Sequence, residues 1–270
     1  MAEEDALLDA LVEQVRSAKK YRNISVVLVR SILSTELEKR RSPKEAVKAT
    51  RNKLHQVAAA YQDTPIPYTA WLEELAHLPT TLHHPSVLDF ITRALPAHAS
   101  TRERVPILPD FFKECLAPLS AIHSVLDLAC GLNPLAIPWM PLQPGFTYTA
   151  CDIYTDMLEF LNAFFTRFNL DGKTVLCDIT REIPAVKVDL TLVLKTIPCL
   201  EQMDKDAGLR LFEMLTSPNI LVSFPAHSLG GKSKGMVRTY EQHFAELLVG
   251  KSWQVSRFEF PGELAFLIQR

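Results

Sequence analysis

The chain has 270 residues, of which 47% are hydrophobic and 22% are charged, so its composition is that of an ordinary globular protein. It contains no run of about 18 apolar residues, which argues against a membrane span. The acidic start Met1–Asp5 lacks the basic-then-apolar pattern of a signal peptide. Its five cysteines never form a Cys-x-x-Cys pair, which argues against a disulfide framework and a zinc site. We therefore expect a cytoplasmic protein with no metal and no membrane partner.

The net charge of −2 hides an uneven distribution along the chain. The segment from Arg16 to Lys53 holds twelve Lys or Arg and three Glu, whereas the remainder is acidic. Such a segment predicts a localised contact with a polyanion, although charge alone equally allows a solvated helical surface.

The first hundred residues are predicted to be helical. Ala6–Arg16 carries an apolar stripe at helical spacing. Ser42 and Pro43 have the residue types of a helix N-cap and first position, and this helix is expected to run to about Tyr61. Two further helices are expected at 68–78 and 85–95.

After Pro118, short β-branched runs alternate with helical stretches, which indicates βα units and a parallel sheet. We expect helices at Thr155–Phe168 and Ala207–Leu215, and strands at Ser124–Leu128, Thr147–Cys151, Thr174–Cys177, Asp189–Leu194, Ile220–Phe224, Gln254–Phe258 and Glu263–Ile268. The last two strands should pair as an antiparallel hairpin because the turn between them is short. The predicted fold is therefore α/β, a seven-stranded Rossmann-like sheet of the S-adenosylmethionine-dependent methyltransferase type. A helical N-terminal domain is expected at 1–97 and a catalytic domain at 98–270.

Polar residues follow the ends of successive predicted strands, where doubly wound sheets bind their ligands. The first strand runs through Asp127 and Ala129 into Gly131, where a glycine lets the backbone approach the methionine part of a cofactor. Asp127 is a candidate for the cofactor's amino group. Asp152, at the end of the second strand, is placed to accept from both ribose hydroxyls.

The third and fourth strands complete the predicted pocket. Asp178 is placed to accept from the adenine amino group with Ile179 beside the ring, and Leu194 and Lys195 would form the floor. Any one of these acids alone is more simply explained as a helix cap; their ordered series favours a cofactor site. A dinucleotide would need Gly-x-Gly-x-x-Gly after the first strand, and only one glycine is present here.

Several longer motifs add a family resemblance that covers most of the chain. Gly131–Ala136 resembles the cofactor turn of the aminoglycoside-resistance 16S rRNA guanine-N7 methyltransferases. His98–Arg104, Leu194–Gln202 and Ser228–Met236 are similar to further segments of that family in the same order. Met203 departs from the pattern, since a second Gln is expected there, and the loop with Lys232 and Lys234 is less Arg-rich than usual.

The resemblance implies S-adenosylmethionine as the cofactor and Arg102 as the contact for its carboxylate. It further implies a pocket that includes His98, Ser100, Thr101, Gly131, Asp152, Ile153, Asp178, Ile179, Leu194 and Gln202. Without it, a surface ion pair is the simpler explanation of Arg102 and of Arg104.

The implied substrate is a guanine of the decoding A site, in helix 44 of 16S rRNA within the 30S subunit. Methylation there would confer aminoglycoside resistance. Guanine N7 has an in-plane lone pair and no proton, so positioning without a general base suffices, and no catalytic residue is assigned. The expected phosphate contacts are Lys19, Lys20, Arg22, Lys232, Lys234 and Arg238. Tyr154, Trp139 and Phe111 are candidates to stack on the base, although each is more simply a core residue.

Three other functions remain open on sequence grounds. The chain is alternatively an adenine-N1 methyltransferase at the same site, a small-molecule methyltransferase with a helical lid, or a non-catalytic RNA-binding protein. Nothing in the sequence demands more than a monomer.

Overall fold

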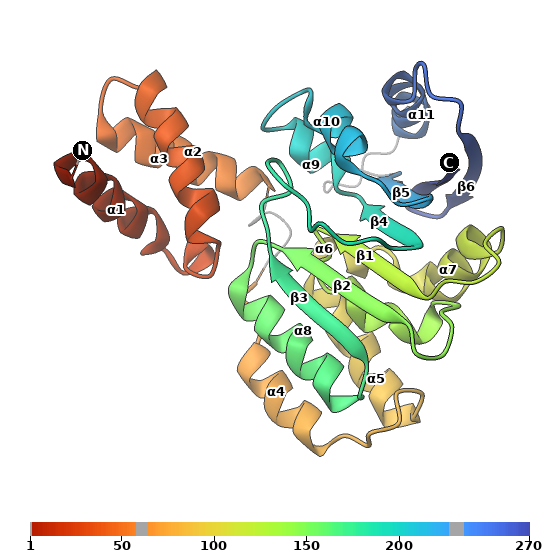
Figure 1. The fold of residues 1–270 in the computed structure, drawn as a ribbon. Helices are drawn as coiled ribbons and strands as arrows, with labels where there is room; N and C mark the ends of the chain where they lie inside the picture. The colour runs from red at the N-terminus through yellow and green to blue at the C-terminus, as the bar shows by residue number, and fades with distance from the viewer. Residues whose placement is uncertain (1, 58–63, 227–234) are drawn as a thin grey trace.

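The protein is represented by a computed structural model that describes residues 2–57, 64–226 and 235–270. It is built on a seven-stranded sheet, and Figure 1 shows helices packed around it. The strand order is β3-β2-β1-β4-β5-β7-β6. The strands are β1 (Ser124–Leu128), β2 (Thr147–Asp152), β3 (Asp171–Leu176), β4 (Leu190–Leu194), β5 (Asn219–Pro225), β6 (Gln254–Phe260) and β7 (Glu263–Gln269). Strands β1 to β5 are parallel, and β7 is antiparallel to both β5 and β6. The predicted fold class and closing hairpin are confirmed.

Side chains alternate between the two faces of the sheet along each strand, and helices cover both faces. In β1, Val125 packs into one core and Leu126 into the other. The first face is covered by α5 (Pro85–Ala94), α7 (Leu108–Leu116) and α8 (Thr155–Arg167), and the second by α9 (Ile197–Glu201), α10 (Ala207–Met214) and α11 (Met236–Leu247). This layering leaves the carboxyl ends of the parallel strands as the open edge.

The start of β3 differs from the expectation. The strand begins at Asp171 and not at Thr174, because Asp171 and Gly172 continue the pairing with Thr147 and Tyr148 of β2. A Cβ atom on Gly172 would lie 2.4 Å from the ring of Phe165, so this strand position requires glycine for close packing against α8. In the sequence, the pair Asp171-Gly172 predicts a turn, but pairing with β2 and packing against α8 make it part of the strand.

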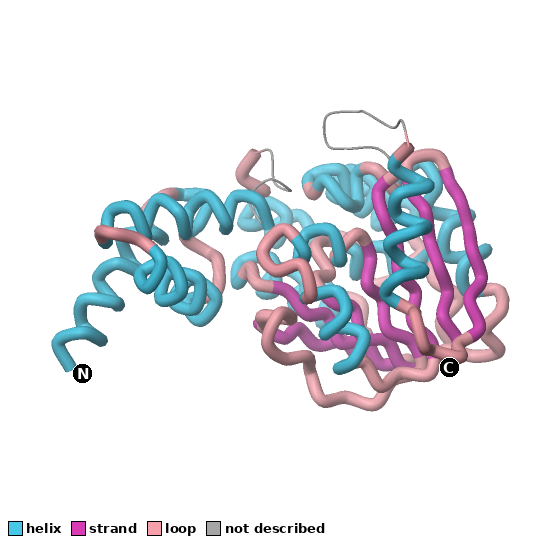
Figure 2. The backbone as a smooth tube through the Cα atoms, turned by 90° about the horizontal axis from the view of Figure 1, so that it is seen from above, coloured by secondary structure: helices cyan, strands magenta, loops and turns pink. Residues whose placement is uncertain are grey.

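The N-terminal helices α1 (Ala2–Arg16), α2 (Val26–Lys39) and α3 (Pro43–Val57) pack against one another in a three-helix bundle. Figure 2 shows the bundle extending to one side of the sheet. The Ser42 Oγ accepts from the Glu45 N–H at 3.3 Å, as the predicted helix start requires. Helix α2, whose limits the sequence did not predict, contains most of the apolar run from Ile24 to Leu33.

A short backbone bridge joins the bundle to the sheet. The Ser25 N–H donates to the Ile153 carbonyl at 2.8 Å, and the Thr155 N–H donates to the Asn23 carbonyl at 2.9 Å. Residues 153–155 directly follow β2, so the bundle is attached at the open edge of the sheet.

Helices α4 (Tyr68–His77) and α5 belong to the layer on the sheet. Helix α4 packs on α8, where the Tyr68 and Phe160 rings lie 5.5 Å apart. Among the helices that the structure describes, only α1 to α3 therefore stand apart from the sheet, while the expected division at 97/98 stays a prediction. Within the described residues, no helix combines the length and apolar character needed to cross a membrane.

Candidate functional site

A cavity lies at the carboxyl ends of β1 to β4, where the sequence predicted the cofactor. Nine of the predicted cofactor residues line it: His98, Ser100, Ala129, Asp152, Ile153, Asp178, Ile179, Leu194 and Lys195. The lining also includes Leu28, Tyr154, Cys177, Thr180, Thr196, Cys199, Leu200 and Met203. Leu28 comes from α2, so the helical bundle contributes a wall of the cavity.

Five predicted cofactor residues lie outside this lining. Asp127 and Gly131 are buried behind it, and the buried Thr101 hydroxyl donates to the Leu95 carbonyl at 2.5 Å. Arg102 and Gln202 are exposed, on α6 (Ala99–Arg102) and directly after α9. Their roles as cofactor contacts stay predictions.

Asp152 holds the cofactor turn against the end of β2. Its Oδ2 accepts from the Gly131 N–H at 2.9 Å and its Oδ1 from the Ile153 N–H at 2.7 Å. Burial raises the pKa of Asp152, and these backbone donors oppose the rise. One carboxylate therefore orders the turns after both β1 and β2.

Two sharp left-handed turns shape the floor. Ala129 after β1 and Lys195 after β4 have φ of 50° and 57°, values that residues with a Cβ atom seldom adopt. Both residues line the cavity, so strained backbone marks this edge of the sheet. The sequence holds no signal for it, because neither position is glycine.

Unsatisfied polar atoms indicate that the cavity is built for a polar ligand. Asp178 Oδ1 accepts from the Thr180 N–H and hydroxyl, whereas the buried Asp178 Oδ2 has no hydrogen-bond partner. The buried Tyr154 hydroxyl is likewise without a hydrogen-bond partner. Buried polar atoms are normally paired, so these two are suited to a ligand or ordered water. An acceptor at Asp178 fits the amino group of an adenine.

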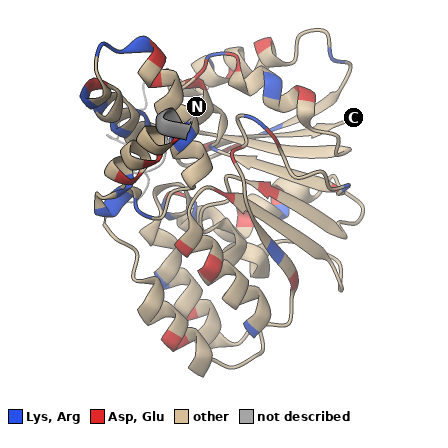
Figure 3. Cartoon of the chain, turned by 60° about the vertical axis from the view of Figure 1, so that its left-hand side comes forward, with Lys and Arg blue, Asp and Glu red and all other residues tan. Residues whose placement is uncertain are grey.

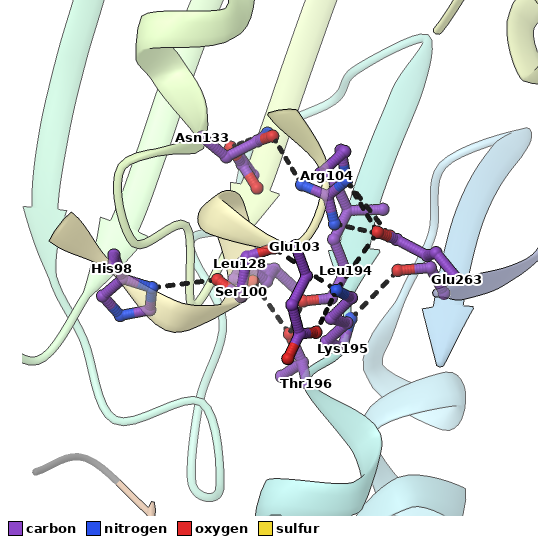
Figure 4. Close-up of polar contacts among 12 residues, drawn as sticks. His98, Ser100, Glu103, Arg104, Leu128, Asn133, Leu194, Lys195, Thr196 and Glu263 are labelled. Atoms are coloured by element: carbon purple, nitrogen blue, oxygen red, sulfur yellow. Dashed lines mark hydrogen bonds and ion pairs between the residues drawn. The ribbon is translucent and has the colours of Figure 1, made fainter. Parts of the chain in front are cut away.

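His98 is a neutral wall of the cavity. Its Nδ1 lies 2.9 Å from the Ser100 Oγ (Figure 4). Burial lowers the pKa of His98 to about 4, and the positive charges of Arg102, Arg104 and Lys195 contribute to this lowering. The imidazole therefore carries no charge at neutral pH.

A network of polar side chains, called here the buried polar network, lies behind the cavity and was not predicted from the sequence. Arg104 is 2% exposed and Glu263 is fully buried; the Arg104 Nη2 lies 2.6 Å from the Glu263 Oε1 (Figure 4). The surface ion pair considered for Arg104 is therefore wrong. On one side, the Lys195 Nζ contacts Glu263 at 3.3 Å and Glu103 at 2.6 Å.

On its other side, the buried polar network reaches the cofactor turn. The Arg104 Nη1 donates to the Asn133 Oδ1 at 3.0 Å, and the Asn133 Nδ2 donates to the Asp127 Oδ2 at 2.8 Å. The Tyr148 hydroxyl donates to the same Asp127 oxygen at 2.6 Å. Asp127 thus has structural partners, and burial raises its pKa to about 7 although these hydrogen bonds oppose the rise. Glu263, which pairs with two cations, keeps a pKa below its usual range.

The three aromatic candidates for base stacking lie in different places. Phe111 is fully buried, with the Arg104 guanidinium 4.8 Å from its ring. Trp139 lies beside residues 117–122, at the amino ends of the strands. Tyr154 alone of the three lines the cavity.

The predicted phosphate-binding residues that the structure describes are all at least partly exposed. They are Lys19, Lys20, Arg22 and Arg238. Lys232 and Lys234 lie outside the described residues. Figure 3 shows Lys and Arg concentrated on the three-helix bundle, which is the end of the molecule that contributes Leu28 to the cavity.

Comparisons with known proteins agree with this architecture. The family model for ribosomal RNA methyltransferase (FmrO) matches residues 16–267. A 16S rRNA (guanine(1405)-N(7))-methyltransferase of Micromonospora rosea is 34% identical over 268 residues, which cover 98% of either protein. The structure of the 16S rRNA methyltransferase RmtF in complex with S-adenosyl-L-homocysteine is 30% identical, with a TM-score of 0.82 over 97% of this chain and 98% of that one. The 16S rRNA methylase RmtB is 28% identical, with a TM-score of 0.80 over 97% and 98%. These similarities extend over the helical bundle as well as the sheet.

Proposed function

The chain belongs to the ribosomal RNA methyltransferase (FmrO) family, and on that premise we propose that it transfers a methyl group from S-adenosylmethionine to N7 of a guanine in 16S rRNA. The observation that carries this proposal is the match to a guanine-N7 methyltransferase over 98% of both chains. The target guanine lies in the decoding A site, in helix 44, and its methylation confers aminoglycoside resistance.

The cavity at the strand ends holds the cofactor in this proposal. Asp152 accepts from the ribose hydroxyls, Asp178 accepts from the adenine amino group, and Arg102 binds the carboxylate. The Asp178 Oδ2 supports the adenine assignment, because it is buried and makes no hydrogen bond, with the Arg181 Nε no closer than 3.9 Å. Asp127 acts behind the turn, since its carboxylate already accepts from Asn133 and Tyr148.

We expect Asp152→Ala to lose cofactor affinity for two reasons. The ribose loses its acceptor, and the Gly131 N–H loses the partner that holds the turn. Calorimetric titration with S-adenosylmethionine measures the effect, and Asp152→Asn, which keeps one acceptor oxygen, should lie between alanine and the native protein. Unchanged affinity in Asp152→Ala would refute this role.

The chemistry needs positioning and little else from the protein. When bound, the cofactor supplies an electrophilic methyl group on its sulfonium. Guanine N7 has a lone pair and no proton to lose, so the protein's task is to hold that atom in line and to exclude water. The neutral His98 suits this task, because it forms part of the wall without repelling a cationic cofactor.

The substrate form and the remaining contacts also belong to this proposal. The enzyme acts in the cytoplasm on the assembled 30S subunit, as a monomer and without a metal. The bundle (residues 2–57) contacts the RNA through Lys19, Lys20 and Arg22, while Arg238, Lys232 and Lys234 supply phosphate contacts from the catalytic domain, 98–270. The cluster of basic residues between Arg16 and Lys53 supports this division of roles.

The direct test is methyl transfer to ribosomal particles. Purified 30S subunits, 50S subunits and naked 16S rRNA are incubated with the enzyme and labelled S-adenosylmethionine. Borohydride reduction and aniline cleavage then locate any N7-methylguanine. We expect label in 30S only, with one cleavage in helix 44; unlabelled 30S subunits would refute the proposal, and label without cleavage would point to adenine.

A further inference from the structure

A second hollow adjoins the cofactor cavity and has no role in the site described so far. Helix α2 forms one bank of this second groove with Ser31, Thr35 and Lys39, and the turn at Asp204 and Lys205 forms the other. Both hollows share four lining residues: Leu28, Asp178, Thr180 and Met203. The groove therefore opens directly into the cavity at a neck between the bundle and the sheet.

The neck is apolar where the two banks meet. Leu28 is 3% exposed, and the partly buried Met203 packs against the same core cluster. These side chains come from α2 and from the turn after α9, so they face the passage from two separate segments. An apolar pair of this kind suits the faces of a planar base, and the polarizable thioether of methionine packs well against aromatic rings.

Beyond the apolar neck, the groove is lined by lysine side chains. Lys39 and Lys205 are exposed on its two banks, and Lys53 reaches it while paired with Glu36 at 2.8 Å. Lysines that flank a passage into a methyl-donor cavity match an RNA strand whose base enters and whose phosphates stay outside. Each of the two Asp residues of the lining has a cation beside it, because the Arg181 Nε lies 3.9 Å from the Asp178 Oδ2 and Asp204 pairs with Arg210 at 2.5 Å.

We propose that this groove is the entry path of the target nucleotide, with the base held between Leu28 and Met203 and the flanking phosphates on Lys39 and Lys205. The inference rests on the proposed function and adds the substrate's route to it. It also replaces Phe111 and Trp139, which lie away from the cavity, as the residues that hold the base.

The test separates transfer rate, substrate binding and cofactor binding. Met203→Ala should lower kcat on 30S roughly tenfold, the scale of removing one side chain that stacks on a base, while Met203→Leu keeps an apolar face and most of the rate. Lys39→Glu with Lys205→Glu should raise KM for 30S roughly tenfold or more and flatten its salt dependence, because fewer phosphates are neutralised on binding. Lys173→Glu with Lys187→Glu, at two exposed lysines that do not line this groove, is the matched control and should leave both constants unchanged.

Calorimetry with S-adenosylmethionine accompanies every variant. Affinity should stay within about twofold of the native protein in the lysine variants, and in Met203→Ala, which also lines the cofactor cavity, it should fall by much less than the rate. Thermal unfolding confirms that each variant folds. Native kcat and KM in Met203→Ala and in the double lysine variant would overturn the entry path. A loss of cofactor affinity in Met203→Ala equal to its loss of rate would overturn it too, by making Met203 a cofactor contact. Absence of label with the native enzyme is a separate result, which refutes the proposed function itself.

Discussion

Gly131 has the backbone conformation and the small size that the cofactor turn needs beside His98. Its φ is +52°, and a Cβ atom there would lie 3.0 Å from the His98 ring. Both the positive φ and the nearby imidazole wall therefore favour glycine at this position. The sequence pointed to this glycine and, by resemblance, to His98, but not to the contact between the two.

We expect Gly131→Ala to weaken S-adenosylmethionine binding by roughly tenfold, since a left-handed residue with a Cβ atom costs about 1–2 kcal/mol and the His98 ring must move. Isothermal titration measures the change. Gly145→Ala is the matched control, because Gly145 also has a positive φ, of 74°, but nothing within 4 Å of the added Cβ. Equal affinities in the two variants would contradict the role of the His98 contact.

Asp127 gives a pH prediction. Burial raises its folded pKa from 3.8 to about 7, so the folded protein binds a proton more tightly than the unfolded chain. The stability from this group is therefore complete below about pH 4 and is lost as the pH rises towards 7. Asp127→Asn keeps an acceptor for Asn133 and Tyr148 without the buried charge.

Asp127→Asn should accordingly unfold at a temperature closer to constant between pH 5 and pH 8, with its largest gain over the native protein at pH 8. Differential scanning calorimetry across this range provides the comparison. Melting curves that shift in parallel for both proteins would show that Asp127 does not titrate in the folded state.

At the scale of elements, the buried polar network joins parts of the fold that are distant in sequence. Arg104 follows α6, Asn133 begins the segment after β1, Lys195 follows β4 and Glu263 begins β7. Their contacts fix the turn after β1 relative to the antiparallel strand that closes the sheet. Asn133 belongs to the segment Gly131–Ala136 that carries the family resemblance. Its side chain is a structural link, since it donates to Asp127 and accepts from Arg104.

Arg104→Met should destabilise the fold by about 3–5 kcal/mol, because it leaves the fully buried Glu263 with only one remaining cation. Urea unfolding measures the loss. Arg93→Met removes the ion pairs of a half-exposed side chain with Glu74 and Asp89 and should cost no more than about 1 kcal/mol. Similar losses in the two variants would mean that burial of the Arg104 pair is unimportant.

At the scale of the whole molecule, charge and cofactor are divided between two bodies that meet at the cavity. The basic bundle supplies Leu28 to the cavity and pairs with residues 153–155 after β2. The sheet supplies the strand-end acids. RNA binding on the bundle would thus take place beside the methyl donor, within the same molecule.

We expect joint replacement of Lys19, Lys20 and Arg22 by Ala to lower activity on 30S and to reduce the salt dependence of binding by about one unit of slope for each phosphate that is no longer neutralised. Cofactor affinity should not change, since none of the three lines the cavity. Joint replacement of Lys113, Lys173 and Lys187, which are exposed on the sheet domain, is the control for total charge. Equal losses in both triple variants would indicate nonspecific attraction.

The sequence by itself determined the order of the strands, the cofactor class and the acids that end the strands. Those features are local: β-branched runs, a single glycine in a turn and carboxylates at strand ends follow from chain position and residue type. For this reason most of the strand limits and nine of the predicted cavity residues are found where they were expected.

Only the tertiary structure decided which distant residues meet. The ion pair of Arg104 and Glu263 joins residues 159 positions apart, and charge patterning along the chain carries no signal for it. Leu28 and Met203 reach one neck because the bundle docks on residues 153–155, a contact made by backbone atoms that any sequence possesses. Burial then sets their chemistry: it turns an apparent surface arginine into a core residue and keeps His98 neutral.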